Sequence, residues 1–393
     1  MYVVTKHTAW QTIEKQVKGG SEQRSRETIE NEIVSEREQE MEPVIYVSGT
    51  PYEQGVQEGK LLKEIIERNV SVILGKLERE HLTDNAAYDA FVENNLDFLR
   101  RENRSVYDEI QGISDGSGIS LENIIKLNIP AYFMAGSFLQ ECSMILARGS
   151  ATLDHKTYVI KNRDMSIFIE QILLHRTYPD GMKIVEITGA GTTTYPACGM
   201  NSFGLGVTNT GFWSRKVRPD AERPGSGHVF LNAHNLLEKC RTAREALEEI
   251  RNTPRLNGLN VIVADPADAF LVEMTKNDCH VTADDGCGLL YHTNHYTTEG
   301  FADMNPEREE YPSTFMRYER IGELLKASYG TLRFQDMYRI MSDHANGVNA
   351  ICRHPQPGAP AQTISSSMFV LEDMEAWTTI DNPCMSIRHA PLG

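Results

Sequence analysis

The last two thirds of the chain consist of short apolar segments separated by turn-forming residues, and this pattern constrains the fold most. After residue 142, seven segments of strand length follow one another: SMILARG, TYVIKN, KIVEIT, GLGVTNT, LNVIVADP, AFLVEMT and SMFVLED. Several neighbours are joined by short turns, which favours antiparallel pairing over a doubly wound parallel sheet. The segments do not alternate cleanly between apolar and polar residues, so we expect sheets that are buried on both faces.

The sequence before residue 142 is mostly helical. VIYVSG predicts a strand, and one long helix over residues 50–77 is expected after it. The helix is entered through Thr50 and Pro51, since proline is tolerated in a first helical turn. Residues 1–42 are charged and poor in aromatics, a composition typical of a solvated helix or tail. We therefore divide the chain into a charged extension (1–42), a helical segment (43–141) and a strand-rich core (142–393) that forms one structural domain with the helical segment.

Composition narrows the class of protein. The sequence is 40% hydrophobic and 24% charged, which is typical of a globular protein. Its net charge is -16 with scattered basic residues, so we expect no nucleic-acid partner. No apolar run approaches the roughly 20 residues of a membrane span, and the amino terminus lacks the pattern of a secretory signal. The seven cysteines include no C-x-x-C pair, which argues against disulfides and zinc ribbons and favours the cytoplasm, with an organelle as the alternative.

A hairpin is predicted around Cys142. Strands at about 144–147 and 157–161 are separated by a turn at residues 153–156. Antiparallel pairing then brings Cys142 to within a few residues of Asp164 across the ladder. Polar neighbours flank the cysteine on both sides, Glu141 and Ser143, a setting that favours a reactive thiol over a core cysteine.

The residues alone leave the base for this nucleophile open. His344 is one candidate and would give a cysteine–histidine hydrolase that needs no self-cleavage. The second is the α-amino group of Cys142 itself, which becomes free if the preceding peptide bond is cut. An inactive binding protein on the same scaffold is the third alternative.

Ten further motifs occur in a characteristic order. They are VSGTPYEQGVQEG, YDEIQGISDGSGIS, ECSMILARGSAT, KNRDM, GMNSFGLGVTNT, GLNVIVADP, YHTNHY, STFMRYER, AICRHP and NPCMS. In this series the chain resembles the acyl-coenzyme A:6-aminopenicillanic acid acyltransferase family, the peptidase C45 type of N-terminal-nucleophile hydrolase. The resemblance implies an α+β fold, a four-layer αββα sandwich, and no cofactor, with acyl-coenzyme A entering as a substrate.

The resemblance also implies roles for individual residues. Self-cleavage between Glu141 and Cys142 would give an α chain and a β chain that stay together, with Cys142 as the nucleophile. Asp164 would hold the new amino group, Asn260 would donate to the oxyanion, and Arg317 would support the aspartate and the nucleophile. Water would complete an amidohydrolase cycle and an amine would complete an acyltransferase cycle, and we favour hydrolysis of a small linear amide over use of an acyl thioester.

Four further polar residues are expected to bind substrate: Asn209, Asn294, Lys161 and Arg163. Lys161 stands where distant acylases of this kind carry arginine, so Arg163 is the alternative for that role. His292 and His295 flank Asn294, but two histidines are too few for a metal site and we expect no metal. The six other cysteines are interpreted as having no catalytic role: Cys198, Cys240, Cys279, Cys287, Cys352 and Cys384.

Overall fold

The computed structural model describes residues 44–130, 141–165, 169–193, 198–212, 214–217, 233–255 and 258–392. The predicted extension at 1–42 lies outside these residues.

Within the described residues the strands form two sheets. The eight-stranded sheet has the order β1 (Val44–Ser48), β4 (Gln171–Thr177), β5 (Lys183–Gly189), β6 (Cys198–Asn201), β7 (Gly206–Gly211), β8 (Leu259–Ala264), β9 (Ala269–Met274) and β10 (Cys279–Ala283). The six-stranded sheet has the order β11 (Leu289–His292), β2 (Glu141–Ala147), β3 (Tyr158–Met165), β12 (Gln362–Val370), β13 (Glu375–Thr379) and β14 (Arg388–His389). The pairing is antiparallel as predicted, with one exception, because β1 pairs with β4 in parallel.

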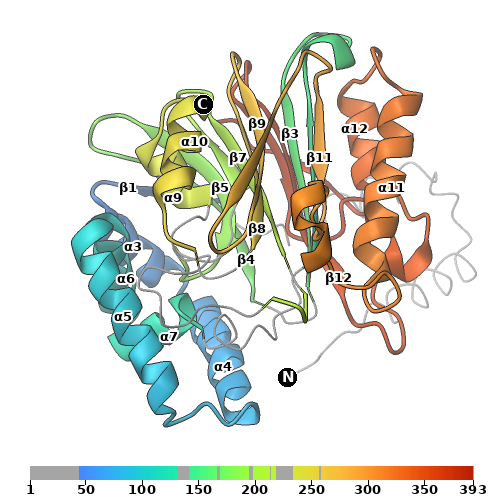
Figure 1. Ribbon diagram of the computed structural model, residues 1–393. Helices are drawn as coiled ribbons and strands as arrows, with labels where there is room; N and C mark the ends of the chain where they lie inside the picture. The colour runs from blue at the N-terminus through green and yellow to red at the C-terminus, as the bar shows by residue number, and fades with distance from the viewer. Residues whose placement is uncertain are drawn as a thin grey trace, which may run out of the picture. The chain divides into compact units, whose positions relative to one another are not determined.

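The sheets pack face to face and helices cover their outer faces. Side chains of both sheets, such as Met144 and Ile262, form one apolar core between them. Helices α9 (Ala233–Lys239) and α10 (Ala243–Asn252) pack on the eight-stranded sheet, and α11 (Pro312–Ala327) and α12 (Phe334–Met341) pack on the six-stranded sheet (Figure 1). The predicted four-layer αββα arrangement and the α+β class are therefore confirmed.

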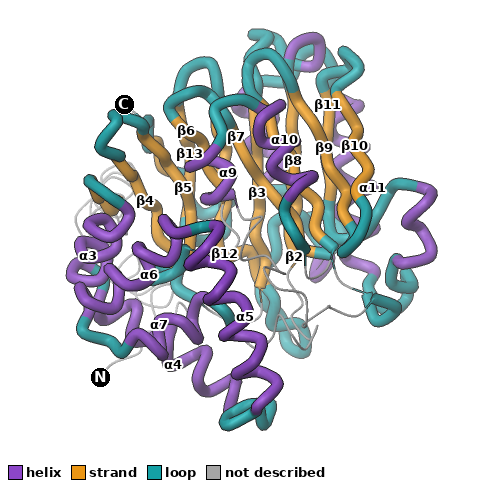
Figure 2. Tube along the Cα trace, turned by 60° about the vertical axis from the view of Figure 1, so that its left-hand side comes forward, coloured by secondary structure: helices purple, strands orange, loops and turns teal. Residues whose placement is uncertain are grey.

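Among residues 44–130, the described part of the chain before Cys142, five helices gather at one end of the strands (Figure 2). They are α3 (Pro51–Leu61), α4 (Lys63–Arg79), α5 (Ala86–Glu102), α6 (Arg104–Ser117) and α7 (Leu121–Asn128). α3 begins at Pro51, as the Thr-Pro entry predicted, and Thr50 caps it in a capping box with Glu53. The single long helix expected after it is two helices that meet at Leu62.

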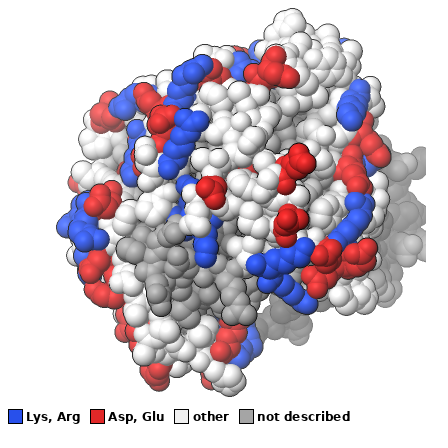
Figure 3. All heavy atoms as spheres, viewed as in Figure 1, with Lys and Arg blue, Asp and Glu red and all other residues white. Residues whose placement is uncertain are grey.

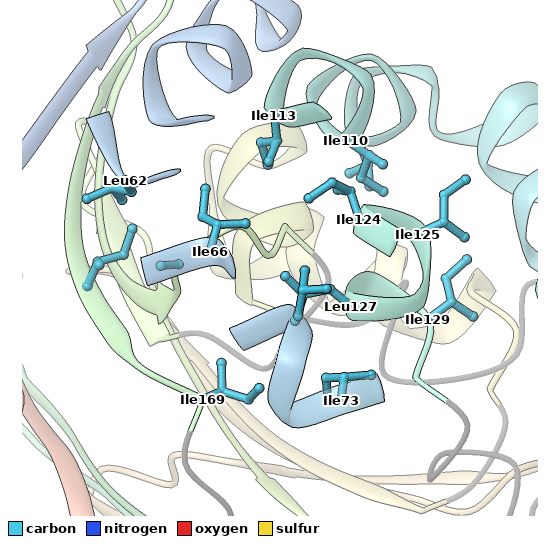
Figure 4. Close-up of a cluster of buried hydrophobic side chains, with 14 of the residues drawn as sticks. Leu62, Ile66, Ile73, Ile110, Ile113, Ile124, Ile125, Leu127, Ile129 and Ile169 are labelled. Carbon is cyan, nitrogen blue, oxygen red and sulfur yellow. The ribbon is translucent and has the colours of Figure 1, made fainter. Parts of the chain in front are cut away.

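These helices share their core with the sheet. Ile66, Ile110 and Leu127 converge with Ile169, which precedes β4 (Figure 4). Ile172 and Leu174 of β4 belong to the same apolar cluster. The helical segment is therefore part of one hydrophobic core with the strands that follow Cys142 in the sequence.

A buried ionic network joins the same two parts. Arg176 of β4 pairs with Glu109 of α6 and with Glu186 of β5, each at 2.7 Å. His234 of α9 lies 3.1 Å from Glu186 and 3.6 Å from Glu109. Burial lowers the pKa of His234, but the two carboxylates outweigh it and raise that pKa to about 9. Removing one member would leave an uncompensated buried charge, so the network holds α6 against the sheet.

None of the described helices is both long enough and apolar enough to cross a lipid bilayer. On the face drawn in Figure 3, Lys and Arg side chains are interspersed with Asp and Glu.

Glycines allow α3 and α6 to pack at backbone contact. A methyl group on Gly55 would come within 2.3 Å of the Glu109 carbonyl oxygen, and one on Gly112 within 2.2 Å of the Tyr52 carbonyl oxygen. These neighbours are backbone atoms, so the helices would have to separate.

We expect Gly112→Ala to lower the free energy of unfolding by about 1–3 kcal/mol, because overpacking forces backbone shifts. Urea denaturation measures this. The matched control is Gly75→Ala in α4, where the nearest atom to an added methyl is the mobile end of Arg79 at 3.3 Å. Alanine there should stabilise by up to about 1 kcal/mol. Equal effects of the two substitutions would contradict the close packing of α3 and α6.

Candidate active site

The hairpin of β2 and β3 places Cys142 beside Asp164. Glu141 pairs with Asp164 and Cys142 pairs with Arg163, which confirms the predicted proximity, although both strands are longer than expected. Cys142 follows the alternation of Met144 and Leu146, which face the core between the sheets. The cysteine is fully buried there.

Arg317 of α11 binds the backbone at Cys142. Its Nη1 donates to the Cys142 carbonyl oxygen and, at 3.0 Å, to Ser143 Oγ, while its Nε donates to Ser313 Oγ at 3.0 Å. Its Nη2 donates to Asn294 Oδ1 at 2.8 Å. The guanidinium is fully buried, and its planar fork fixes the position of the Cys142 peptide group.

Asn294 binds the preceding peptide group, between Glu141 and Cys142. Its Oδ1 accepts the backbone N–H of Cys142 at 2.9 Å, and its Nδ2 donates to Gly211 O at 2.8 Å. The pairing of β11 with β2 ends where His292 meets Met144, so a side chain replaces the strand ladder at Cys142. The backbone nitrogen that would become an amino group is thus held by a side-chain amide.

Asp164 lies buried with one oxygen unsatisfied. Its Oδ1 accepts the Thr363 hydroxyl at 2.6 Å, whereas its Oδ2 has no hydrogen-bond partner within the described ranges. Burial raises the pKa of Asp164 to about 6, against the opposing effects of Arg317, Thr363 and Lys161. A buried carboxylate oxygen without a donor is costly, so this atom is suited to accept a hydrogen bond from a new cationic group.

Lys161 and Arg163 stand on the same strand as Asp164. Lys161 Nζ donates to the backbone oxygen and to Oδ1 of Asn209, at 2.7 and 2.9 Å. Burial lowers the pKa of Lys161, while negative charge on Cys142 acts to raise it. Arg163 Nη1 donates to Gln171 Oε1 at 2.8 Å. Lys161 therefore brings a buried cation, with Asn209, into the surroundings of the thiol.

Asn260 lies on β8, the strand that pairs with β7, which carries Asn209. Its Nδ2 has two long contacts, to Thr210 Oγ1 and to the Thr293 carbonyl, both 3.4 Å. Its Oδ1 has no hydrogen-bond partner in the part of the chain that the structure describes. The amide nitrogen of Asn260 thus makes only long, weak hydrogen bonds, and its role as an oxyanion donor stays a prediction.

Sequence reasoning missed three neighbours of this site. Tyr311, directly before α11, is buried against Arg317, and burial raises its pKa. Arg353 pairs with Glu141, and Thr363 binds Asp164. Of these three residues, only Arg353 lies in one of the motifs that the sequence analysis singled out, AICRHP.

His344 does not support the alternative of a cysteine–histidine hydrolase. Its Nε2 lies 3.2 Å from His354 Nε2. No hydrogen bond joins His344 to Cys142 among the residues that the structure describes.

Comparison with known proteins agrees with the sequence resemblance. The model of the family described as acyl-coenzyme A:6-aminopenicillanic acid acyl-transferase matches residues 152–384, more than half of the chain, and the chain belongs to this family. The matched range includes Asp164, Asn260 and Arg317 and begins on the carboxyl side of Cys142. The prediction of family membership is therefore confirmed.

One curated relative and two solved structures are also similar to the chain. Protein dcd1A of Dictyostelium discoideum is 32% identical over 130 residues, which span 28% of this chain and 28% of that protein. A conjugated bile acid hydrolase from Clostridium perfringens has a TM-score of 0.43 and 12% identity, covering 64% of this chain and 92% of that one. Penicillin V acylase from Agrobacterium tumefaciens has the same TM-score and identity, covering 64% of this chain and 86% of that one.

Proposed function

We propose that the protein is a self-processing cysteine N-terminal-nucleophile enzyme that hydrolyses a linear amide through a thioester on Cys142. The observation that carries this proposal is that side chains hold both backbone polar groups of Cys142. Asn294 takes the N–H of Cys142, and Arg317 takes both its carbonyl oxygen and Asn294. For a cysteine within a continuous strand ladder, backbone groups of the neighbouring strands would take the place of these two side chains.

Self-processing would begin at the bond between Glu141 and Cys142. The Cys142 thiol attacks the carbonyl carbon of Glu141, its proton passes to the departing Cys142 nitrogen, and an internal thioester forms. Water then hydrolyses the thioester, which leaves a carboxylate on Glu141 and an amino group on Cys142. Asn294 Oδ1 and the unsatisfied Asp164 Oδ2 would receive the hydrogens of that amine.

In turnover the new α-amino group would serve as the base. It takes the thiol proton, the thiolate attacks the amide carbonyl, and the same amine returns the proton to the leaving nitrogen. Asn260 Nδ2 is the proposed oxyanion donor, since a fixed amide donor is worth roughly 2.7–4 kcal/mol. Water releases the acyl group, whereas an amine acceptor would make the same intermediate an acyltransferase step.

The helical segment would remain bound after cleavage. It shares an apolar core with β4, and α6 contributes Glu109 to the buried network of Arg176 and Glu186. Breaking such a network by removing one partner typically costs about 3–5 kcal/mol. The two chains would therefore purify as one particle.

We expect N-hexanoyl-p-nitroanilide to leave a hexanoyl thioester on Cys142 of the 142–393 fragment. Rapid acid quench and mass spectrometry would show one hexanoyl addition to that fragment, together with release of p-nitroaniline. Hexanoyl-coenzyme A tests the thioester route in parallel.

The matched control for this trapping is Cys198→Ala. Cys198 is a buried cysteine in the same core, hydrogen-bonded to Ser367 at 3.3 Å, and burial raises its pKa. Its substitution should leave the label in place, whereas Cys142→Ala should abolish it. A label that survives Cys142→Ala would overturn the assignment of the nucleophile.

We expect self-cleavage to slow as the pH falls through about 6, because the Asp164 carboxylate is then protonated. The folded pKa lies above the ordinary value of 3.8, so ionising this group costs folding stability as pH rises to 6. Protonation of Asp164 at low pH therefore does not destabilise the fold, and a loss of self-cleavage there would not result from unfolding driven by this group. Asp164→Asn should remove this pH step and slow cleavage roughly 10- to 150-fold, the worth of a hydrogen bond to a charged group at about 1.5–3 kcal/mol.

Cell-free synthesis followed by a time course of fragment formation at several pH values measures this effect. Asp154→Asn, in the exposed turn of the same hairpin, is the control and should keep the wild-type profile. An unchanged profile in Asp164→Asn would contradict the role given to Asp164.

A further inference from the structure

Four side chains that the proposed reaction does not use meet in one cluster. They are His344, Cys352, His354 and Cys384, whose ligand atoms all lie within 4.8 Å of one another. His344 follows α12, Cys352 and His354 precede β12, and Cys384 follows β13. Two imidazoles and two thiols are the ligand set of many structural zinc sites.

The separations fit a tetrahedral ion. Cys352 Sγ and Cys384 Sγ are 3.7 Å apart, and His354 Nε2 lies 3.2 Å from Cys384 Sγ and 3.2 Å from His344 Nε2. Zinc bonds of about 2.3 Å to sulfur and 2.0–2.1 Å to nitrogen place tetrahedral ligand atoms roughly 3.3–3.8 Å apart. The distance from Cys352 Sγ to His354 Nε2 is slightly longer, at 4.0 Å. A disulfide would need its sulfurs at about 2.05 Å.

We propose that His344, Cys352, His354 and Cys384 bind one Zn²⁺ ion in a closed structural site. Two nitrogen and two sulfur ligands in tetrahedral arrangement select zinc over hard cations such as Mg²⁺ and Ca²⁺, which require oxygen. Four protein ligands leave no position for a reacting water. The cluster runs from the buried Cys352 to the exposed His344, so the ion reaches it from solvent.

Supporting contacts hold the buried ligand in place. The Cys352 N–H donates to the Asp343 carbonyl at 2.9 Å. Asn382 Nδ2 lies 3.6 Å from Cys352 Sγ and donates to the Arg353 carbonyl at 2.6 Å. Such outer contacts orient ligands and are typical of built metal sites.

The ion would fix Arg353, which lies between two of the ligands in sequence. The Arg353 guanidinium pairs with Glu141. The backbone N–H of Arg353 donates at 2.9 Å to Thr363 Oγ1, which in turn donates to Asp164. Zinc would cross-link the α12–β12 connection to the loop after β13 and so hold this segment against the hairpin of Cys142. The proposed zinc site is therefore structural. It would stabilise the segment of Arg353, which contacts Glu141 directly before Cys142.

Metal content of the full-length Cys142→Ala chain tests the inference independently of cleavage and turnover. After incubation with Zn²⁺ and gel filtration we expect one zinc per chain by inductively coupled plasma mass spectrometry. Co²⁺ in its place should show the visible absorption of a tetrahedral thiolate site. His344→Ala and Cys384→Ala should each lower the bound metal at least about tenfold at limiting metal, because ligand loss removes binding energy.

Two substitutions outside the cluster serve as controls. His280→Ala and Cys287→Ser change an exposed histidine and an exposed cysteine and should keep one zinc per chain. Circular dichroism verifies folding, and His344→Ala is the least disruptive ligand change because His344 is exposed. Absence of bound zinc, equal zinc in the ligand variants and the controls, or a disulfide between Cys352 and Cys384 in fresh protein would each overturn the site.

Discussion

The buried guanidinium of Arg317 is the interaction on which the rest of the site depends. Taking an arginine out of water is costly unless its donors are satisfied. Here the carbonyl of Cys142, the amide oxygen of Asn294 and the hydroxyl of Ser313 satisfy them. Beyond the end of the β11–β2 pairing at Met144, the Cys142 N–H donates to Asn294, whose oxygen Arg317 also binds. The position of Cys142 therefore follows from the need to satisfy a buried cation.

The four layers make that position rigid. Cys142 sits on a strand inside the six-stranded sheet, Asn294 follows the neighbouring strand β11, and Arg317 comes from the helix that covers this sheet. Cys142 and Arg317 thus lie on a strand and a helix that pack in one buried apolar cluster. The helical segment adds a shared core and a buried ionic network on the other sheet, so these contacts, and not the chain connection alone, hold it to the strands.

Much of this could be predicted from local pattern. The hairpin register follows from strand period and turn chemistry, which is why Cys142 and Asp164 were expected to meet. Strands such as β4 and β10 were missed because QILLHRT and CHVTA mix polar with apolar residues. The break at Leu62 carries no proline or glycine signal. Arg353, Thr363 and the histidine–cysteine cluster come from distant segments, and only tertiary packing brings them together.

The central claim is that Cys142 becomes the first residue of a separate chain. The intact mass of freshly purified protein, measured beside its Cys142→Ala variant, tests this most directly. The account predicts fragments 1–141 and 142–393 in the wild type and one unbroken chain in the variant. A single chain of 393 residues in both, persisting on incubation, would contradict it.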